Sequence, residues 1–305
     1  MKRLTVRLKN LEFKNPVLPA SGTFGFGREY SSFFDLDILG GIVTKSITMF
    51  PRVGNPQPRI YEIYGGVLNS IGLENPGISY FVDNELPFIK SINTIKVVSI
   101  AGSKIEEYVE LSSILDNTPI DAIEINLSCP NVEEDYVYFG EDEAALSKVI
   151  KEIRSETSKF LIVKLSSGTN NIVNLTKRAS EAGVDAVCIG NTIKGMAIDV
   201  DNKAPVFKNV VAGLSGPAIK PIALRAVWDV YEALQIPIIG CGGIMNFKDA
   251  LEFIFAGASL VQVGTANFSS PLVMPTIISD LTSYCEEKDV AISDLIGIAH
   301  KGKKL

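Results

Sequence analysis

Short apolar runs that alternate with amphipathic segments constrain the fold of this chain more than any other feature. A parallel sheet covered on its outer side has this pattern, because its strands are buried on both faces. Eight runs rich in Val, Ile and Leu predict strands at residues 16–20, 41–45, 97–101, 122–126, 161–165, 186–190, 237–241 and 260–264. Segments with 3.6-residue periodicity predict helices at residues 28–37, 105–115, 141–156, 172–182, 223–234, 247–255 and 275–288.

Eight strands with intervening helices predict an α/β fold of the (β/α)8 barrel type, forming one domain over residues 1–305. The alternative is an open doubly wound sheet, which usually carries a GxGxxG turn after an early strand. Residues 22–27 read GTFGFG instead. Two long connections, 46–96 with a hairpin expected around Gly65 and Gly66, and 191–221, leave from carboxyl ends of strands. Barrel enzymes bind their ligands at that face, so we expect both loops to cover a ligand.

The charge balance and the cysteines argue against several classes of function. Lys and Arg number 29 against 35 Asp and Glu, so no excess of positive charge exists to neutralise nucleic-acid phosphates. No apolar run reaches the ~20 residues needed to cross a bilayer, and the first ten residues lack the apolar core of a signal peptide. The four cysteines include no CxxC pair, which argues against a zinc or iron–sulfur site here. We expect a cytoplasmic protein that binds neither nucleic acid nor membrane nor metal.

Polar residues gather where the predicted strands end. In a barrel these ends meet at one mouth, although they are far apart in sequence. They are Ser21, Gly22, Lys45, Ser46, Ser99, Asn126, Cys129, Lys164, Asn191, Thr192, Gly242, Gly243, Gly264 and Thr265. The glycine pairs after the last two strands favour a phosphate site, because backbone N–H groups and helix N-termini can approach an anion there. The alternative is that these glycines only make tight turns.

Two lysines interrupt apolar runs, Lys45 in IVTK and Lys164 in LIVKL. A buried ammonium needs a partner, which could be a structural ion pair or an anionic ligand such as a reduced flavin. A Schiff-base lysine is a further alternative. Carboxamides recur at Asn69, Asn126, Asn131 and Asn191. Their convergence suits a planar ligand rich in carbonyl and N–H groups, since each amide both donates and accepts.

Cys129 stands in NLSCPN, where Pro130 ends the preceding strand. The thiol could be a nucleophile, a general base or a packed core residue. The only histidine, His300, lies near the end of the chain, which argues against a protease-type Cys–His pair. Proton transfer by a lone thiol stays open. The acidic and aromatic segment 132–141 could close over the site, whereas we assign Cys188, Cys241 and Cys285 to structure, with Cys241 close enough to the glycine pair to touch a cofactor.

Nine motifs in this order resemble the class 1 dihydroorotate dehydrogenases, most closely the catalytic subunits of the NAD-linked class 1B type. The resemblance covers essentially the whole chain. The motifs are ASGTFGFG (20–27), GIVTKSIT (41–48), GNPQPRI (54–60), LNSIGLENPG (68–77), INLSCPN (125–131), NTIKGMAID (191–199), GLSGPAIKP (213–221), GCGGI (240–244) and VGTANF (263–268).

The resemblance implies FMN at the barrel mouth and oxidation of (S)-dihydroorotate to orotate in pyrimidine synthesis, with Cys129 as the base that takes the C5 proton while hydride leaves C6. It implies FMN contacts at Ser21, Lys45, Ser46, Ser99, Asn126, Lys164, Gly190, Gly216, Gly242, Gly243, Gly264 and Thr265. It implies orotate contacts at Lys45, Asn69, Ser70, Ile71, Gly72, Leu73, Asn126, Asn131, Asn191 and Thr192.

Two positions depart from the class 1B pattern, which usually has Asn where this chain has Ser99 and Ile where it has Gly190. A serine at the first of these positions is typical of fumarate-using class 1A sequences. The resemblance also implies a partner subunit with FAD and a [2Fe–2S] cluster that passes electrons to NAD, in a heterotetramer built on a homodimer of this chain. A class 1A-like enzyme, a phosphate-site lyase or aldolase with a Schiff-base Lys45 or Lys164, and a non-catalytic ligand-binding barrel stay open.

Overall fold

The computed structural model describes residues 2–127 and 139–302. Eight parallel strands form one sheet, with the hydrogen-bonded order β3-β16-β15-β10-β9-β8-β7-β4. Apart from β3 and β16, which are the first and last of these eight strands along the chain, strands that are neighbours in the sheet are also consecutive among the eight along the chain. Strands β3 and β4 nearly close the ring, and the Gly40 N–H donates to the Val17 carbonyl at 3.1 Å. The strands are β3 (Val17–Pro19), β4 (Gly41–Val43), β7 (Ile95–Ile100), β8 (Ala122–Asn126), β9 (Phe160–Leu165), β10 (Ala186–Ile189), β15 (Ile238–Cys241) and β16 (Leu260–Val263).

The barrel strands form because both of their faces can be buried. Every residue of β8, β9, β10, β15 and β16 is buried, as expected for apolar runs in a parallel sheet covered by helices. The predicted (β/α)8 architecture is therefore confirmed. The register places Asn126 opposite Lys164, and Lys164 opposite Cys188. Three residues that the sequence analysis singled out thus lie at one level of the barrel, near the carboxyl ends.

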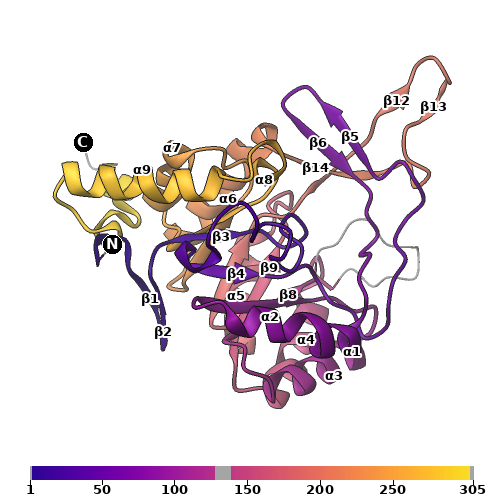
Figure 1. The fold of residues 1–305 in the computed structure, drawn as a ribbon, viewed down its shortest axis with the longest axis horizontal. Coiled ribbons are helices and arrows are strands. Elements are labelled where there is room, and N and C mark those ends of the chain that lie inside the picture. The colour runs from indigo at the N-terminus through magenta and orange to yellow at the C-terminus, as the bar shows by residue number, and fades with distance from the viewer. Residues whose placement is uncertain (1, 128–138, 303–305) are drawn as a thin grey trace.

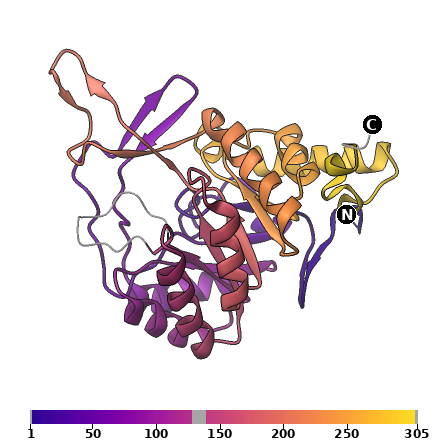
Figure 2. The same ribbon diagram turned by 180° about the vertical axis from the view of Figure 1, so that it is seen from behind.

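Helices cover the outside of the barrel (Figures 1 and 2). On α4, the buried residues Leu146, Val149, Ile150 and Ile153 follow the spacing that brings side chains to one helix face. Asp142 caps this helix by accepting from the Ala145 N–H at 2.7 Å. The helices are α1 (Ile78–Tyr80), α2 (Leu86–Ser91), α3 (Ile105–Asp116), α4 (Glu143–Glu156), α5 (Ile172–Ala182), α6 (Lys220–Ala233), α7 (Phe247–Phe255), α8 (Ala266–Ser269), α9 (Val273–Glu287) and α10 (Ile298–Lys301).

The predicted helix at residues 28–37 is wrong. This segment makes successive turns and ends in a short 3-10 helix, Leu36–Ile38. Gly27 enters it at φ +95°, and the Ser31 hydroxyl donates to the Arg28 carbonyl at 2.8 Å, which competes with continued helix formation. The other six predicted helices are present, with ends shifted by at most three residues. The helical stretch from Ile78 to Ser91, which includes a π-helical turn at Phe81–Glu85, was not predicted.

The long connections build a second sheet above the barrel mouth, with the order β11-β14-β6-β5. The hairpin expected around Gly65 and Gly66 is confirmed, since Ile63 pairs with Gly66. This sheet and a neighbouring hairpin project away from the barrel (Figure 1). The strands concerned are β5 (Ile60–Ile63), β6 (Gly66–Asn69), β11 (Ile193–Gly195), β14 (Ala212–Ser215), β12 (Ile198–Asp199) and β13 (Ala204–Pro205). A hairpin of β1 (Val6–Leu8) and β2 (Leu11–Phe13) precedes the barrel.

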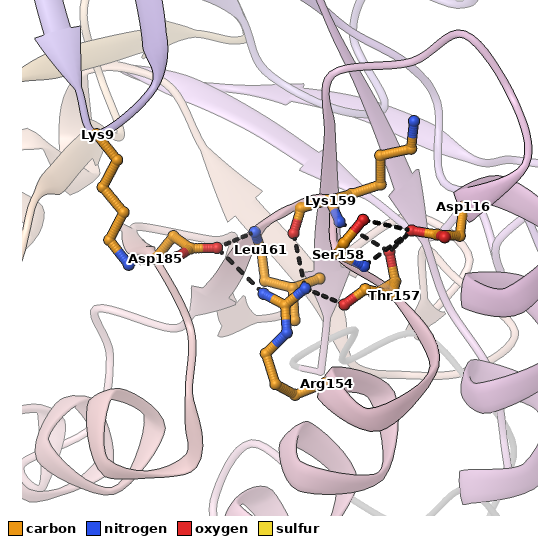
Figure 3. A network of polar contacts seen from close by, with 8 residues as sticks. All are labelled: Lys9, Asp116, Arg154, Thr157, Ser158, Lys159, Leu161 and Asp185. Carbon is orange, nitrogen blue, oxygen red and sulfur yellow. Dashed lines mark hydrogen bonds and ion pairs between the residues drawn. The ribbon is translucent and has the colours of Figure 1, made fainter.

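Polar contacts fix the loops at the amino ends of the barrel strands (Figure 3). Asp185 lies just before β10 and accepts from the backbone N–H of Leu161 at 2.7 Å and from Arg154 Nη1 at 3.2 Å. Lys9, from the turn between β1 and β2, also pairs with Asp185. This face therefore ties the N-terminal hairpin, α4 and two barrel strands together, a stabilising role typical of the amino end of a barrel.

A second carboxylate in Figure 3, Asp116 at the end of α3, fixes the loop that enters β9. Its Oδ1 accepts from the Thr157 hydroxyl at 2.6 Å and from the Ser158 backbone N–H at 2.8 Å. The hydrogen bond from Thr157 is the largest of the effects that lower the pKa of this carboxyl group. Since hydrogen bonds to the charged form stabilise it, Asp116 favours folding while it is ionised.

Candidate functional site

Two adjoining cavities open at the carboxyl ends of the barrel strands. The inner cavity lies among the glycine turns, and the outer cavity lies beneath β5 and β6. They share Ser21, Thr23, Asn191, Thr192 and Ser215 as lining residues. Residues from separate strand ends are therefore brought to one continuous space, as the barrel interpretation of the sequence requires.

Glycines shape the floor of the inner cavity. Gly242 and Gly243 have φ of +129° and +71°, and a Cβ on Gly243 would lie 2.9 Å from the Gly216 carbonyl oxygen. Side chains are therefore excluded at this turn. A Cβ on Gly264 would make only ordinary contacts, the nearest at 3.5 Å. The packing of the protein itself does not require glycine at 264. The close approach of a ligand to the backbone would explain why glycine stands there.

The chain after Gly216 forms a 3-10 turn, Pro217–Ile219, that runs directly into α6. Helix α6 has 14 residues, and its positive N-terminal end lies beside the glycine turns, because a Cβ on Gly243 would lie 3.0 Å from the Lys220 backbone nitrogen. Lys220 in its first turn donates to Asp249 Oδ1 at 2.6 Å, and Asp249 Oδ2 accepts from the Met245 N–H at 2.9 Å. These contacts fix the loop after β15, and the whole arrangement suits a phosphate group.

Lys164 is buried where the inner cavity meets the barrel interior. Its Nζ donates to Gln262 Oε1 at 3.0 Å and to the Ser21 hydroxyl at 3.5 Å, and lies 4.0 Å from Glu124 Oε1. Burial acts to lower the pKa of Lys164, but the negative charges of Cys241 and Glu124 outweigh it and raise the pKa above that of an ordinary lysine. The Lys164 amine is therefore protonated, and this residue forms part of the wall of the inner cavity.

Two buried thiols lie beside Lys164. A hydrogen bond from Cys188 and the charge of Lys164 lower the pKa of Cys241, against the effect of burial. Burial raises the pKa of Cys188, whose Sγ lies 3.4 Å from Gln262 Oε1. Cys241 lines the inner cavity, in line with the expectation that it is close enough to touch a cofactor.

A chain of polar side chains runs from Asn191, which lines both cavities, into the wall of the outer cavity. The Asn191 amide donates to Asn126 Oδ1 at 3.3 Å, and the Asn126 amide donates to the Ser46 hydroxyl at 3.3 Å. Ser46 lies 2.9 Å from Ser99 Oγ, which is fully buried behind it. The Tyr108 hydroxyl fixes the Asn126 backbone by donating to its carbonyl at 2.9 Å. Because these amides constrain one another, their polar groups are held ready for a ligand.

The loop after β6 forms one wall of the outer cavity. Asn69 donates to the Gly213 carbonyl at 3.1 Å, which joins this loop to β14. Gly72 and Leu73 both have positive φ, +74° and +56°. Arg59 pairs with Glu74 at 2.8 Å and so fixes the end of the loop. The loop therefore presents Asn69 and residues 71–74 to the cavity.

Most predicted site residues line one of the cavities. The inner cavity contains Ser21, Lys164, Gly190, Asn191, Thr192, Gly216, Gly242, Gly243, Gly264 and Thr265. The outer cavity contains Ser21, Lys45, Ser46, Asn69, Ile71, Gly72, Leu73, Asn126, Asn191 and Thr192.

Ser70 and Ser99 line neither cavity. The Ser70 hydroxyl instead accepts from the Asn55 amide at 3.0 Å, and the Ser99 hydroxyl bonds to that of Ser46. Cys129 and Asn131 lie outside the described residues, as do residues 132–138 of the expected lid.

Several lining residues were not predicted as site residues, among them Thr23, Ser215 and Phe268. Ser215 accepts from the Thr265 hydroxyl at 2.8 Å, which ties β14 to the turn after β16. The GLSG run at 213–216 was a usable signal for Ser215. Phe268 ends the VGTANF run at 263–268, but it was not singled out because an aromatic residue in a short helix is most often a core residue.

Gly190, which stands where the resemblance implies Ile, has a backbone conformation that favours glycine. It has φ +130°, and a Cβ there would lie 1.7 Å from the Cys241 carbonyl oxygen. The usual Ile at this position could not be accommodated without a change of backbone conformation. By contrast, the departure at Ser99 lies behind the cavity wall.

Within the described ranges, no group of three or more His, Cys, Asp and Glu side chains is placed to hold a metal ion. None of the helices described is long and apolar enough to cross a bilayer. The fold and the polar mouth thus define a (β/α)8 barrel with two adjoining cavities at the carboxyl ends of its strands.

Comparisons with known proteins identify the family. The dihydroorotate dehydrogenase family model matches residues 3–284. The curated dihydroorotate dehydrogenase B (NAD(+)) catalytic subunit of Geotalea uraniireducens is 47% identical over 296 residues, which cover 96% of this chain and 97% of that protein. Its counterpart in Caldicellulosiruptor bescii is 48% identical over 295 residues, 96% of this chain and 98% of that protein. The chain therefore belongs to the dihydroorotate dehydrogenase family.

A solved structure supports the fold independently. The dihydroorotate dehydrogenase of Eimeria tenella, in complex with ferulenol, superposes with a TM-score of 0.80 at 23% identity, covering 98% of this chain and 89% of that one. At this identity the likeness concerns the barrel alone. Family membership makes the chain an oxidoreductase of a flavin-dependent family.

Proposed function

We propose that this chain oxidises (S)-dihydroorotate to orotate in pyrimidine synthesis, with FMN in the inner cavity and the substrate in the outer one. The observation that carries the proposal is the shared wall of the two cavities. Ser21, Asn191 and Thr192 line both, so a ligand in one lies against a ligand in the other. Contact between two planar ligands is what hydride transfer requires.

The inner cavity fits FMN. Its glycine turns admit close backbone approach, and the N-terminal end of α6 favours a phosphate. The buried Lys164 provides a positive charge where negative charge develops on reduction. Bound FMN supplies the hydride acceptor; Ser21, Lys164 and the turns at Gly242 and Gly264 hold and orient it. These residues therefore fit the cofactor that the family resemblance implies.

The outer cavity suits a planar ring with carbonyl and N–H groups. Asn69, Asn126 and Asn191 line it, and each amide both donates and accepts. Lys45 at its edge supplies a positive charge for a carboxylate. We propose that Cys129 takes the C5 proton of the substrate and that Asn131 adds a further amide contact. In the sequence, these two residues come three and five positions after Asn126, the last residue of β8.

The relatives are named as catalytic subunits that use NAD+. That name implies a partner subunit. We propose that the partner of this chain carries FAD and a [2Fe–2S] cluster that pass electrons to NAD, in a heterotetramer built on a homodimer of this chain. Ser99 keeps a fumarate-using class 1A enzyme as the alternative, although its buried position behind Ser46 weakens the argument.

A Schiff-base reaction at Lys164 is disfavoured by the site. A lysine must lose its proton to attack a carbonyl group. The pKa of Lys164 is raised by the negative charges around it, so the amine is held in the protonated form. A lyase or aldolase would need the opposite shift.

Substitution of Cys129 tests the proposed base. In Cys129→Ala we expect bound FMN to be retained and flavin reduction by dihydroorotate to be lost, because no group remains to take the C5 proton. Cys129→Ser should keep a small part of the rate, since a hydroxyl is a poorer base at neutral pH. Stopped-flow absorbance of the flavin measures both. A wild-type rate in the alanine variant would reject the role of Cys129.

The electron acceptor is tested by reoxidation. The reduced protein is mixed with NAD or with fumarate, with and without the protein that copurifies with it. We expect NAD to restore oxidised flavin only when the partner subunit is present. Fumarate-dependent turnover by the chain alone, with no second subunit in the native complex, would assign it to class 1A.

A further inference from the structure

A cluster of three polar side chains, each from a different strand, is buried inside the barrel below the inner cavity. It consists of Glu124 on β8, Lys164 on β9 and Gln262 on β16, which expose 0%, 3% and 0% of their surface. Glu124 Oε1 makes no hydrogen bond among the described residues. Burying a carboxylate is costly, so its presence beside the proposed flavin site calls for a physical reason.

Glu124 fixes the orientation of the Gln262 amide. Gln262 Nε2 donates to Glu124 Oε2 at 2.6 Å. An ionised carboxylate can only accept, so the amide nitrogen must face Glu124 and the amide oxygen must face Lys164. Gln262 Oε1 then accepts from Lys164 Nζ at 3.0 Å. The carboxylate thus acts on the ammonium through the glutamine.

Gln262 also keeps the two charges from direct contact. Lys164 Nζ and Glu124 Oε1 are 4.0 Å apart, longer than a charge-assisted hydrogen bond. On its other side the ammonium reaches the Ser21 hydroxyl at 3.5 Å, and Ser21 lines both cavities. The ammonium is therefore held between the barrel interior and the mouth.

We propose that Glu124 and Gln262 are positioning residues that set how strongly the site favours reduced over oxidised flavin. Glu124 offsets part of the positive charge of Lys164, and Gln262 holds the ammonium toward the cavity. This inference rests on the proposed function, because it requires FMN in the inner cavity.

Two substitutions should act in opposite directions. Glu124→Gln removes a negative charge beside the ammonium, so reduced, more negative flavin should bind relatively more tightly. We expect about a tenfold change in the ratio of the two affinities, which for a two-electron couple raises the midpoint potential by about 30 mV. Gln262→Met lets Lys164 turn to Glu124 and away from the flavin, so the potential should fall.

The test is an anaerobic potentiometric titration of the FMN-loaded protein. Asp116→Asn is the matched control, because it removes the same charge at the opposite end of the barrel, beside Ser158 rather than the cavities. It should leave the potential unchanged. An unchanged or lowered potential in Glu124→Gln, or a shift of both variants in one direction, would overturn the inference.

Three further outcomes also decide the test. If Glu124→Gln does not fold, Gln262→Met carries the test, and a potential that does not fall rejects the positioning role. Wild-type protein that binds no FMN overturns the proposed function together with this inference. Wild-type protein with FMN and normal reduction by dihydroorotate, but unmoved potentials in both variants, overturns this inference alone.

Discussion

Replacing Lys164 with Met should destabilise the FMN-free protein far more than replacing Lys164 and Glu124 together. The two side chains expose 4% and 0% of their surface, and their charges lie 4.0 Å apart. Lys164→Met leaves the Glu124 carboxylate buried without its cation. Lys164→Met/Glu124→Gln removes both charges while keeping the volumes similar, and the amide of Gln262 can still bond to a glutamine at 124.

The size of the effect follows from the burial of the pair. Removing one partner of a buried ion pair costs roughly 3–5 kcal/mol, because the remaining charge is uncompensated, whereas replacing both is often neutral. At about 2 °C per kcal/mol for a large domain, the single variant should melt about 6–10 °C lower. The double variant should recover most of this loss.

The assay is urea and thermal unfolding, followed by circular dichroism, of wild-type, both single variants and the double variant at one pH. The FMN-free form is used so that cofactor binding does not add to the measured stability. The four free energies of unfolding form a double-mutant cycle. A single variant Lys164→Met within about 1 kcal/mol of wild type, or a double variant no more stable than the single one, would refute the reasoning.

The remaining predictions concern glycines and the amino-end network. Gly190→Ala should cost more than about 3 kcal/mol, because its Cβ would lie 1.7 Å from the Cys241 carbonyl oxygen. Gly264→Ala, where a Cβ has only ordinary contacts, should keep wild-type stability while FMN binding weakens; equal effects of both variants on stability would contradict this. Asp116→Asn should cost about 1 kcal/mol at pH 7, since two strong hydrogen bonds, one of them from Thr157, lose their charged acceptor. Folding lowers the pKa of Asp116, so its carboxylate stabilises the protein above the pKa of the unfolded state, and this stabilisation is lost as pH falls through the pKa of the folded state. Urea unfolding should therefore show the stability difference between wild type and Asp116→Asn shrinking below about pH 4. A pH-independent difference would reject the assignment.

The barrel could be predicted because burial on both faces leaves a clear mark in sequence. Runs such as 161–165 contain apolar residues at nearly every position, and they became strands. The segment 28–37 failed because its periodicity is similar to that of a helix while Gly27 and Ser31 favour turns. The strands of the projecting hairpin, Ile198–Asp199 and Ala204–Pro205, are two residues long and largely exposed, so no hydrophobic pattern marks them.

The site was predictable where polar residues follow a strand, and less so inside one. Lys164 was found because a charge interrupts an apolar run. Glu124 and Gln262 interrupt their runs in the same way, yet the sequence could not place them together, because three separated strands bring them into contact. Ser70 turns away from the cavity between Asn69 and Ile71, since successive residues of an extended segment point to opposite sides.

The most direct test of the account is an anaerobic titration of the purified wild-type protein with (S)-dihydroorotate. The account predicts a yellow protein with one FMN per chain, whose flavin absorbance bleaches as an equal amount of orotate is formed. A colourless protein, or bound flavin that dihydroorotate does not bleach, would contradict it.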